Sequence, residues 1–105
     1  MKKIKIMVNT MEIEVLNEIF SLINRITDPT RESRVARSAL LSVCQRLKSK
    51  SVNGYPKNKK LSFSMAFYEA HYLEMFLREV YKYDYGEYAW NVILTIKNEL
   101  NQQLA

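Results

Sequence analysis

His71, the one histidine of the chain, is the residue type best suited to acid–base chemistry near neutral pH. It lies between Glu69 and Glu74 in a stretch with helical spacing, and a carboxylate such as Glu74 or Glu14 could orient it as a general base. The sequence offers no second histidine for a metal cluster and marks no nucleophile. We therefore expect His71 to be a half-exposed helical residue without a catalytic role.

Cys44 is the second residue that could do chemistry. It is the only cysteine, so the chain cannot form an internal disulfide and fits a reducing compartment. A catalytic cysteine needs an activating histidine and access to substrate. Cys44 falls on an apolar helical stripe, while the nearby Arg46 and Lys48 point off that stripe. The spacing therefore predicts that Cys44 packs in the core.

Three carboxylates, Glu12, Glu14 and Glu18, share the first helical segment. Metal sites in helical bundles use Glu-x-x-His pairs from facing helices, and this sequence has no such pair. We expect these glutamates to form a solvated face. The only two glycines, Gly54 and Gly86, cannot build a glycine-rich nucleotide loop. The sequence therefore predicts a non-catalytic protein with no cofactor and no metal.

The basic residues are concentrated between Arg31 and Lys60. This segment holds nine basic residues and one acid, Glu32, for a formal charge of +8, whereas the rest has seven basic and ten acidic residues, or −3. Such a block could contact nucleic-acid phosphates, although no recognition-helix turn, zinc finger or RNA-stacking signature accompanies it. It could equally be a solvated face, or pair with the chain's own acidic face in an oligomer. The candidate nucleic-acid contacts are Arg31, Arg34, Arg37, Arg46, Lys48, Lys50, Lys57, Lys59 and Lys60.

Aromatic residues are concentrated in the second half of the chain. Ten of the twelve lie between Phe63 and Trp90. Phe67 and Phe76 fit a core stripe, but the tyrosines do not all fit, and Tyr and Trp are enriched at protein interfaces. The alternatives are large side chains that fill a small fold, or, less favoured, a small-molecule pocket between helices. The candidate protein interface is Tyr68, Tyr72, Tyr83, Tyr85, Tyr88 and Trp90.

The first half of the chain reads as a strand followed by two helices. Alternation predicts a strand over 3–8 with one buried face, and Asn9 with Glu12 predicts a capping box. The first helix should run to about Ile26, and the Asp28-Pro29 pair should start a second that ends near Lys50. The predicted buried face of this second helix is Val35, Ala36, Ala39, Leu40, Val43, Cys44 and Leu47.

The second half predicts the same order after an Asn53-Gly54 turn. Leu61 and Phe63 begin a short strand, and Ser64 should cap a third helix that ends near Tyr83. Its apolar stripe has spacings of three and four: Ala66, Phe67, Ala70, Leu73, Phe76/Leu77 and Val80. The last helix should run over 87–101, with residues 102–105 fraying.

These elements predict one α+β domain over 1–105 that is mostly helical. Two strand–helix–helix pseudo-repeats, 2–50 and 59–101, align at an offset of 57 and then 53 positions, with a connection over 51–58. Two short strands cannot stand alone, so they should pair with each other, within the chain or between subunits, with four helices over one face.

Association is the function that this pattern favours. We expect a small non-catalytic protein that binds a protein partner, or a second copy as a homodimer, through the aromatic surface. The alternative is a nucleic-acid-binding accessory protein that uses residues 31–60. Apolar runs fall far short of the ~18 residues of a membrane span, so we expect a cytoplasmic protein without membrane contact and without a small-molecule ligand.

Overall fold

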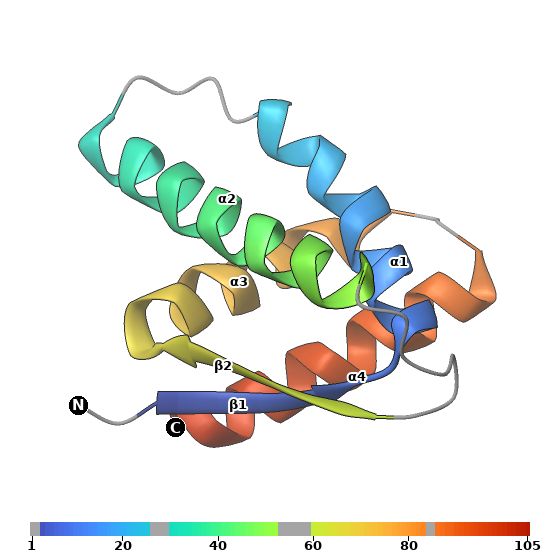
Figure 1. The fold of residues 1–105 in the computed structure, drawn as a ribbon. Coiled ribbons are helices and arrows are strands. Elements are labelled where there is room, and N and C mark those ends of the chain that lie inside the picture. Colours follow the sequence, from blue (N-terminus) through green and yellow to red (C-terminus); the bar gives the residue numbers. More distant parts are fainter. Residues whose placement is uncertain (1–2, 26–29, 53–59, 84–85) are drawn as a thin grey trace.

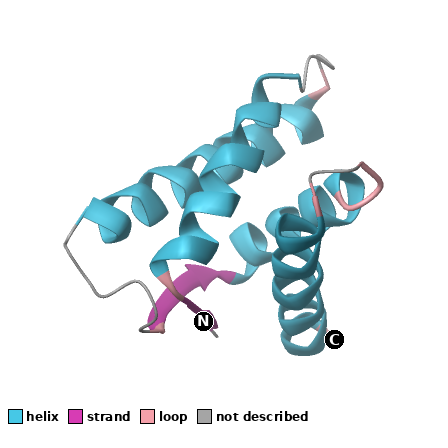
Figure 2. Cartoon of the chain, turned by 90° about the vertical axis from the view of Figure 1, so that its right-hand side faces the viewer, coloured by secondary structure: helices cyan, strands magenta, loops and turns pink. Residues whose placement is uncertain are grey.

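The computed structural model describes residues 3–25, 30–52, 60–83 and 86–105, and it confirms a mostly helical α+β fold (Figure 1). The elements in chain order are β1 (Lys3–Val8), α1 (Thr10–Ile19), the 3-10 helix η1 (Phe20–Arg25), α2 (Arg31–Val52), β2 (Leu61–Ala66), α3 (Phe67–Val80) and α4 (Glu87–Leu104). Figure 2 shows the helices as two layers that the strands join at one end. α1 packs on α2 and α3 on α4, while α2 also contacts α3.

The two strands form an antiparallel pair within the chain, as the first of the two predicted arrangements requires. Ile6 lies opposite Phe63, and Lys3 opposite Ala66. Ile4, Ile6, Val8, Phe63 and Met65 are buried, so one face of the sheet enters the core under the helices. The alternating burial of β1 follows from the period of two in a strand.

Side chains from the helices close both free edges of this sheet. On β1, the Lys5 N–H donates to Gln103 Oε1 (3.2 Å), and Gln103 Nε2 donates to the Lys5 carbonyl oxygen (2.7 Å). On β2, Lys50 Nζ donates to the Ser62 carbonyl oxygen (2.9 Å), and Arg46 Nη1 donates to that of Ser64 (3.1 Å). An unpaired strand edge invites pairing with other chains, and these contacts occupy much of it.

Helix starts differ between the two halves. Asn9 and Glu12 form the predicted capping box of α1. The prediction that Ser64 caps α3 is wrong, because β2 continues through Ser64, which pairs with Lys5, and α3 begins only after Ala66. Cross-strand pairing therefore overrides the local capping preference of serine. Glu69 compensates, since its carboxylate accepts the Ala66 N–H at 2.9 Å.

The core agrees with most predicted positions, but Phe67 and Val35 are exposed. Phe67 is 47% exposed because it lies in the first turn of α3, directly after the strand. Val35 is 43% exposed, and Ala36 is half-buried. Leu40 is on the buried side of α2, and five residues of α-helix turn Val35 about 140° away from it.

Three helix ends also differ from the predictions. The first helix tightens to 3-10 geometry at Phe20, and its predicted end at Ile26 lies outside the described residues. α3 ends at Val80, before the predicted Tyr83. α4 continues to Leu104 without fraying at Gln102, because Gln103 is held on β1.

Both halves thus have the order strand, helix, helix, and the strands pair at Ile6 and Phe63, which the 57-position offset equates. The pseudo-repeat of residues 2–50 and 59–101 stays a prediction.

Replacing Gln103 by alanine should lower the free energy of unfolding by about 1 kcal/mol relative to the same change at Gln102. The reason is the loss of two hydrogen bonds to Lys5. A typical hydrogen bond contributes ~0.5–1.5 kcal/mol to stability, and these two are exposed to solvent, so each should contribute a value near the lower limit. Urea denaturation of Gln103→Ala and Gln102→Ala measures the difference. Equal midpoints for the two variants would show that the edge contact contributes nothing.

Candidate functional site

A cleft with a volume of about 720 Å³ lies between α2 and α3. Residues of both layers line it, from η1, from the N-terminal half of α2 and from the C-terminal half of α3. Apolar side chains supply most of its surface: Leu22, Ala36, Leu40, Tyr72, Met75, Phe76, Val80 and Tyr83. Polar groups also line it, and they include Thr30, Glu32, Ser33, Arg78 and Glu79. Concave, mainly apolar sites with a few polar groups are typical of ligand or peptide binding.

The predicted aromatic interface does not form one patch. Tyr72 and Tyr83 come together in the cleft, and the Tyr83 side chain is 63% exposed. Trp90 stacks on Tyr81 with ring centroids 4.8 Å apart, and it shares a second depression with Tyr83. Of the remaining candidates, Tyr68 is exposed beside the N-terminal half of α2 and Tyr88 is exposed on α4, while Tyr85 lies outside the described residues.

Leu22, Ala36 and Met75 are cleft residues that the sequence analysis did not assign to a site. Ala36 was expected in the core, and Leu22 and Met75 were given no role. A signal was present on α3, where Tyr72, Met75, Phe76, Glu79 and Tyr83 follow each other at helical spacings beside the core stripe.

Three of the nine candidate nucleic-acid contacts form hydrogen bonds or ion pairs with other residues of the chain. Arg46 binds Glu69 and lies over the Phe63 ring, Lys50 binds β2, and Lys60 Nζ lies 2.6 Å from Glu12 Oε1. Lys48 is exposed on α2 and is not without an interaction partner. Lys57 and Lys59 lie outside the described residues. Arg31, Arg34 and Arg37 are exposed on α2, and their side chains form no hydrogen bond or ion pair with another described residue.

Two buried glutamates form ion pairs with two of these basic residues. Glu12 was expected on a solvated face but is only 8% exposed, because its carboxylate accepts the Asn9 N–H and pairs with Lys60. Glu69 does the same with Ala66 and Arg46. Each glutamate stands three residues after its N-cap, which is the sequence signal for the backbone contact. The cation partners come from distant segments and carry no local signal.

The pKa of Glu69 is the net result of opposed effects. Burial raises it, but the hydrogen bonds from the Ala66 N–H, Arg46 and Ser42, with the charge of Arg46, hold the pKa below the ordinary value of 4.5. A carboxyl whose folded pKa is lowered stabilises the protein above its unfolded pKa. This stability is lost as the pH falls through the folded value.

The residues that could do chemistry are not assembled into a site. His71 is exposed and lies edge-on to the Tyr72 ring, 5.2 Å between centroids. Glu74, which could have oriented it, is buried and bound by Arg78 at 2.7 Å. Cys44 is buried in the core, as predicted. No group of metal-ligating side chains occurs among the described residues.

The chain matches no protein-family model, no curated protein and no solved structure. Within the ranges that the structure describes, each helix is too short or too polar to cross a membrane.

Replacing Glu69 by glutamine should destabilise the protein by about 1–3 kcal/mol at pH 7, the usual value of hydrogen bonds to a charged group. The penalty should shrink below pH 4.5 and vanish once the wild-type carboxyl is protonated in the folded state. Thermal or urea unfolding between pH 3 and pH 7 measures this.

Glu14→Gln is the matched control, since Glu14 is exposed on α1, and it should have little effect at any pH. A penalty for Glu69→Gln that is independent of pH would contradict the role given to its charge.

Proposed function

We propose that this protein is a non-catalytic binding protein whose cleft receives an amphipathic helix of a protein partner. The observation that carries the proposal is the apolar cleft between α2 and α3, at whose edge Tyr83 and Met75 stay exposed. Exposed apolar side chains around a concave site favour an interaction surface over a solvated one. Aromatic and methionine side chains are also enriched at protein interfaces.

The length of the cleft supports a helix as its occupant. Its lining on α3 extends from Tyr72 to Val80, about 12 Å along the helix axis, and on α2 from Glu32 to Leu40, also about 12 Å. An amphipathic helix docks through anchors at positions i, i+3 or i+4, and i+7, which span about 10 Å. The cleft therefore fits two turns of a partner helix between its walls.

Charge at the cleft supports basic flanks on that helix. Glu32 and Glu79 lie on opposite walls. Glu79 is paired with Lys82, whereas the Glu32 side chain forms no hydrogen bond or ion pair with another described residue. Arg78, the one basic residue of the lining, is already held by three hydrogen bonds to Glu74. An apolar stripe with lysine or arginine beside it would complement this arrangement.

A second copy of the chain is a poorer occupant than a different protein. Each described α-helix already turns its apolar stripe into its own core, through residues such as Leu16 of α1, Leu73 of α3 and Ile93 of α4. A homodimer through the cleft would need another segment to fill it, and it remains an outcome that the following experiment detects.

Filling the cleft should abolish helix binding. The probe is a fluorescent 14-residue amphipathic peptide with leucines at helical spacing and lysines beside them, measured by anisotropy. Ala36→Phe, which places a ring in the cleft, should weaken binding at least about tenfold. Ser38→Phe is the control, because Ser38 lies on the exposed side of the same helix.

Equal affinity of the two variants, or equal binding of a scrambled peptide, would contradict the proposal. Sedimentation equilibrium at about 10–100 μM tests the homodimer. A dimer that only Ala36→Phe dissociates would make a second copy the occupant and overturn the choice of a different partner.

A further inference from the structure

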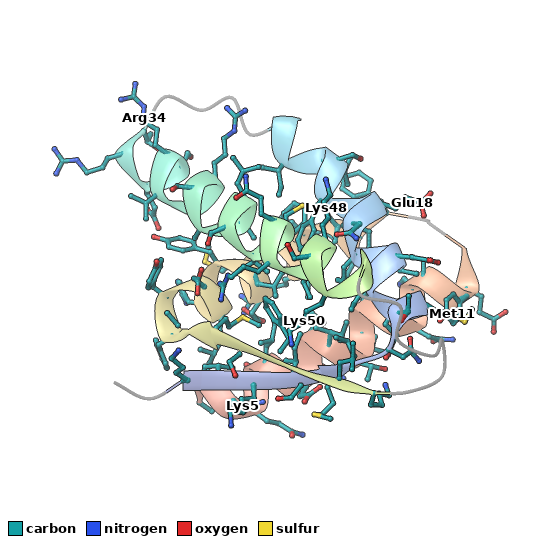
Figure 3. The ribbon with its side chains drawn as sticks, viewed as in Figure 1. Lys5, Met11, Glu18, Arg34, Lys48 and Lys50 are labelled. Atoms are coloured by element: carbon teal, nitrogen blue, oxygen red, sulfur yellow. The ribbon has the colours of Figure 1, made fainter. Side chains whose placement is uncertain are left out.

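The outer face of α2 is long, exposed and free of acids. Between Ser33 and Val52 every charged residue of α2 is basic, and the one acid, Glu32, lines the cleft. With 22 residues, α2 is about 33 Å long. Figure 3 shows Arg34 pointing away from the fold at the N-terminal end of α2, with Lys48 further along the same helix. The exposed residues that follow helical spacing on this face are Arg34, Ser38, Leu41, Gln45, Lys48 and Ser49.

The arginines near the start of this face destabilise the helix through their charge. The N-terminus of a helix carries a partial positive charge, so cations in its first turn are unfavourable. Arg31 and Arg34 nevertheless lie there, and their side chains and that of Arg37 form no hydrogen bond or ion pair with another described residue. In contrast, Arg46 and Lys60 pair with glutamates of the chain, and Lys50 donates to a carbonyl oxygen of β2. Since no described acid neutralises them, these three exposed side chains are available to anions from outside the chain.

We propose that the outer face of α2 binds double-stranded DNA by entering the major groove, with Arg31, Arg34 and Arg37 on phosphates. A B-form major groove is about 12 Å wide and admits an α-helix. Between and beyond the arginines, α2 exposes short or slender side chains that reach base edges: serine hydroxyls, the Gln45 amide and the apolar end of Leu41.

RNA and single strands fit this face less well. The major groove of A-form RNA is too deep and narrow for side chains to read, and single-strand binding relies on aromatic platforms. The sequence of α2 contains no aromatic residue, and the exposed Tyr68 beside its N-terminal half supplies one ring, whereas a single strand stacks successive bases on several aromatic side chains. The DNA face and the cleft lie on different sides of α2, so this inference does not depend on the proposed function.

Salt dependence tests the phosphate contacts. Three engaged phosphates predict binding to a mixed-sequence 20-base-pair duplex that is roughly 40-fold weaker at 200 mM than at 50 mM salt. Arg34→Gln with Arg37→Gln should reduce that ratio to about fourfold. Lys3→Gln with Lys5→Gln removes the same charge from exposed β1 residues and should leave the ratio unchanged; Lys5 lies far from Arg34 in Figure 3.

A bulky substitution on the outer face of α2 tests whether the helix enters the major groove. Ser38→Trp adds bulk to the centre of the face without changing charge, and it should weaken duplex DNA binding at least about tenfold, whereas Ala36→Phe in the cleft should not. An RNA duplex and a single strand of the same sequence should bind at least about tenfold more weakly than the DNA duplex. Thermal melting confirms that each variant is folded.

Three results would overturn the proposal: no duplex binding at 50 mM salt, equal affinity for the RNA duplex, or full binding by Ser38→Trp. The last two would reduce the face to a general polyanion surface.

Discussion

The pairing of β1 with β2 is the constraint on which the other parts of the structure depend. It joins Ile6 to Phe63, 57 positions apart in the sequence, and so fixes how the α1–α2 layer sits against the α3–α4 layer. A two-stranded sheet is marginal in water. Here its inner face is buried in the core, and side chains from α2 and α4 occupy its edges. The strands thus connect the two layers at one end, and the cleft lies between α2 and α3.

Position on the fold separates the basic residues into two groups. Arg46 and Lys60 neutralise Glu69 and Glu12, two carboxylates that would be costly to bury alone. Arg34 and its neighbours near the start of α2 have no such role among the described residues. The high charge of the segment therefore has two physical causes. One is internal pairing, which supports the fold, and the other is an exposed face, for which we propose an external partner.

Local patterns in the sequence predicted most of the fold. The alternation of β1 and the Asn9–Glu12 box were correct because they depend on neighbouring residues. The failures came from long-range contacts. The local sequence predicts Ser64 as a helix cap, but Ser64 pairs across the sheet with Lys5. It also predicts Glu12 on a solvated face, but Glu12 binds Lys60, which is 48 residues away in the sequence. The cleft could not be predicted, because it exists only where Ala36 of α2 comes to face Met75 of α3.

The central claim is that the cleft between the helical layers is an open binding surface for a helix. Methyl NMR during titration with the amphipathic peptide tests it most directly, because it reports each side of α2 separately. A helix bound in the cleft should shift the methyl resonances of Leu22, Ala36, Leu40 and Met75, which line the cleft, and should leave those of Val35 and Leu41 on the exposed side of α2 unchanged. Unchanged cleft methyls at saturating peptide, or shifts confined to Val35 and Leu41, would contradict it.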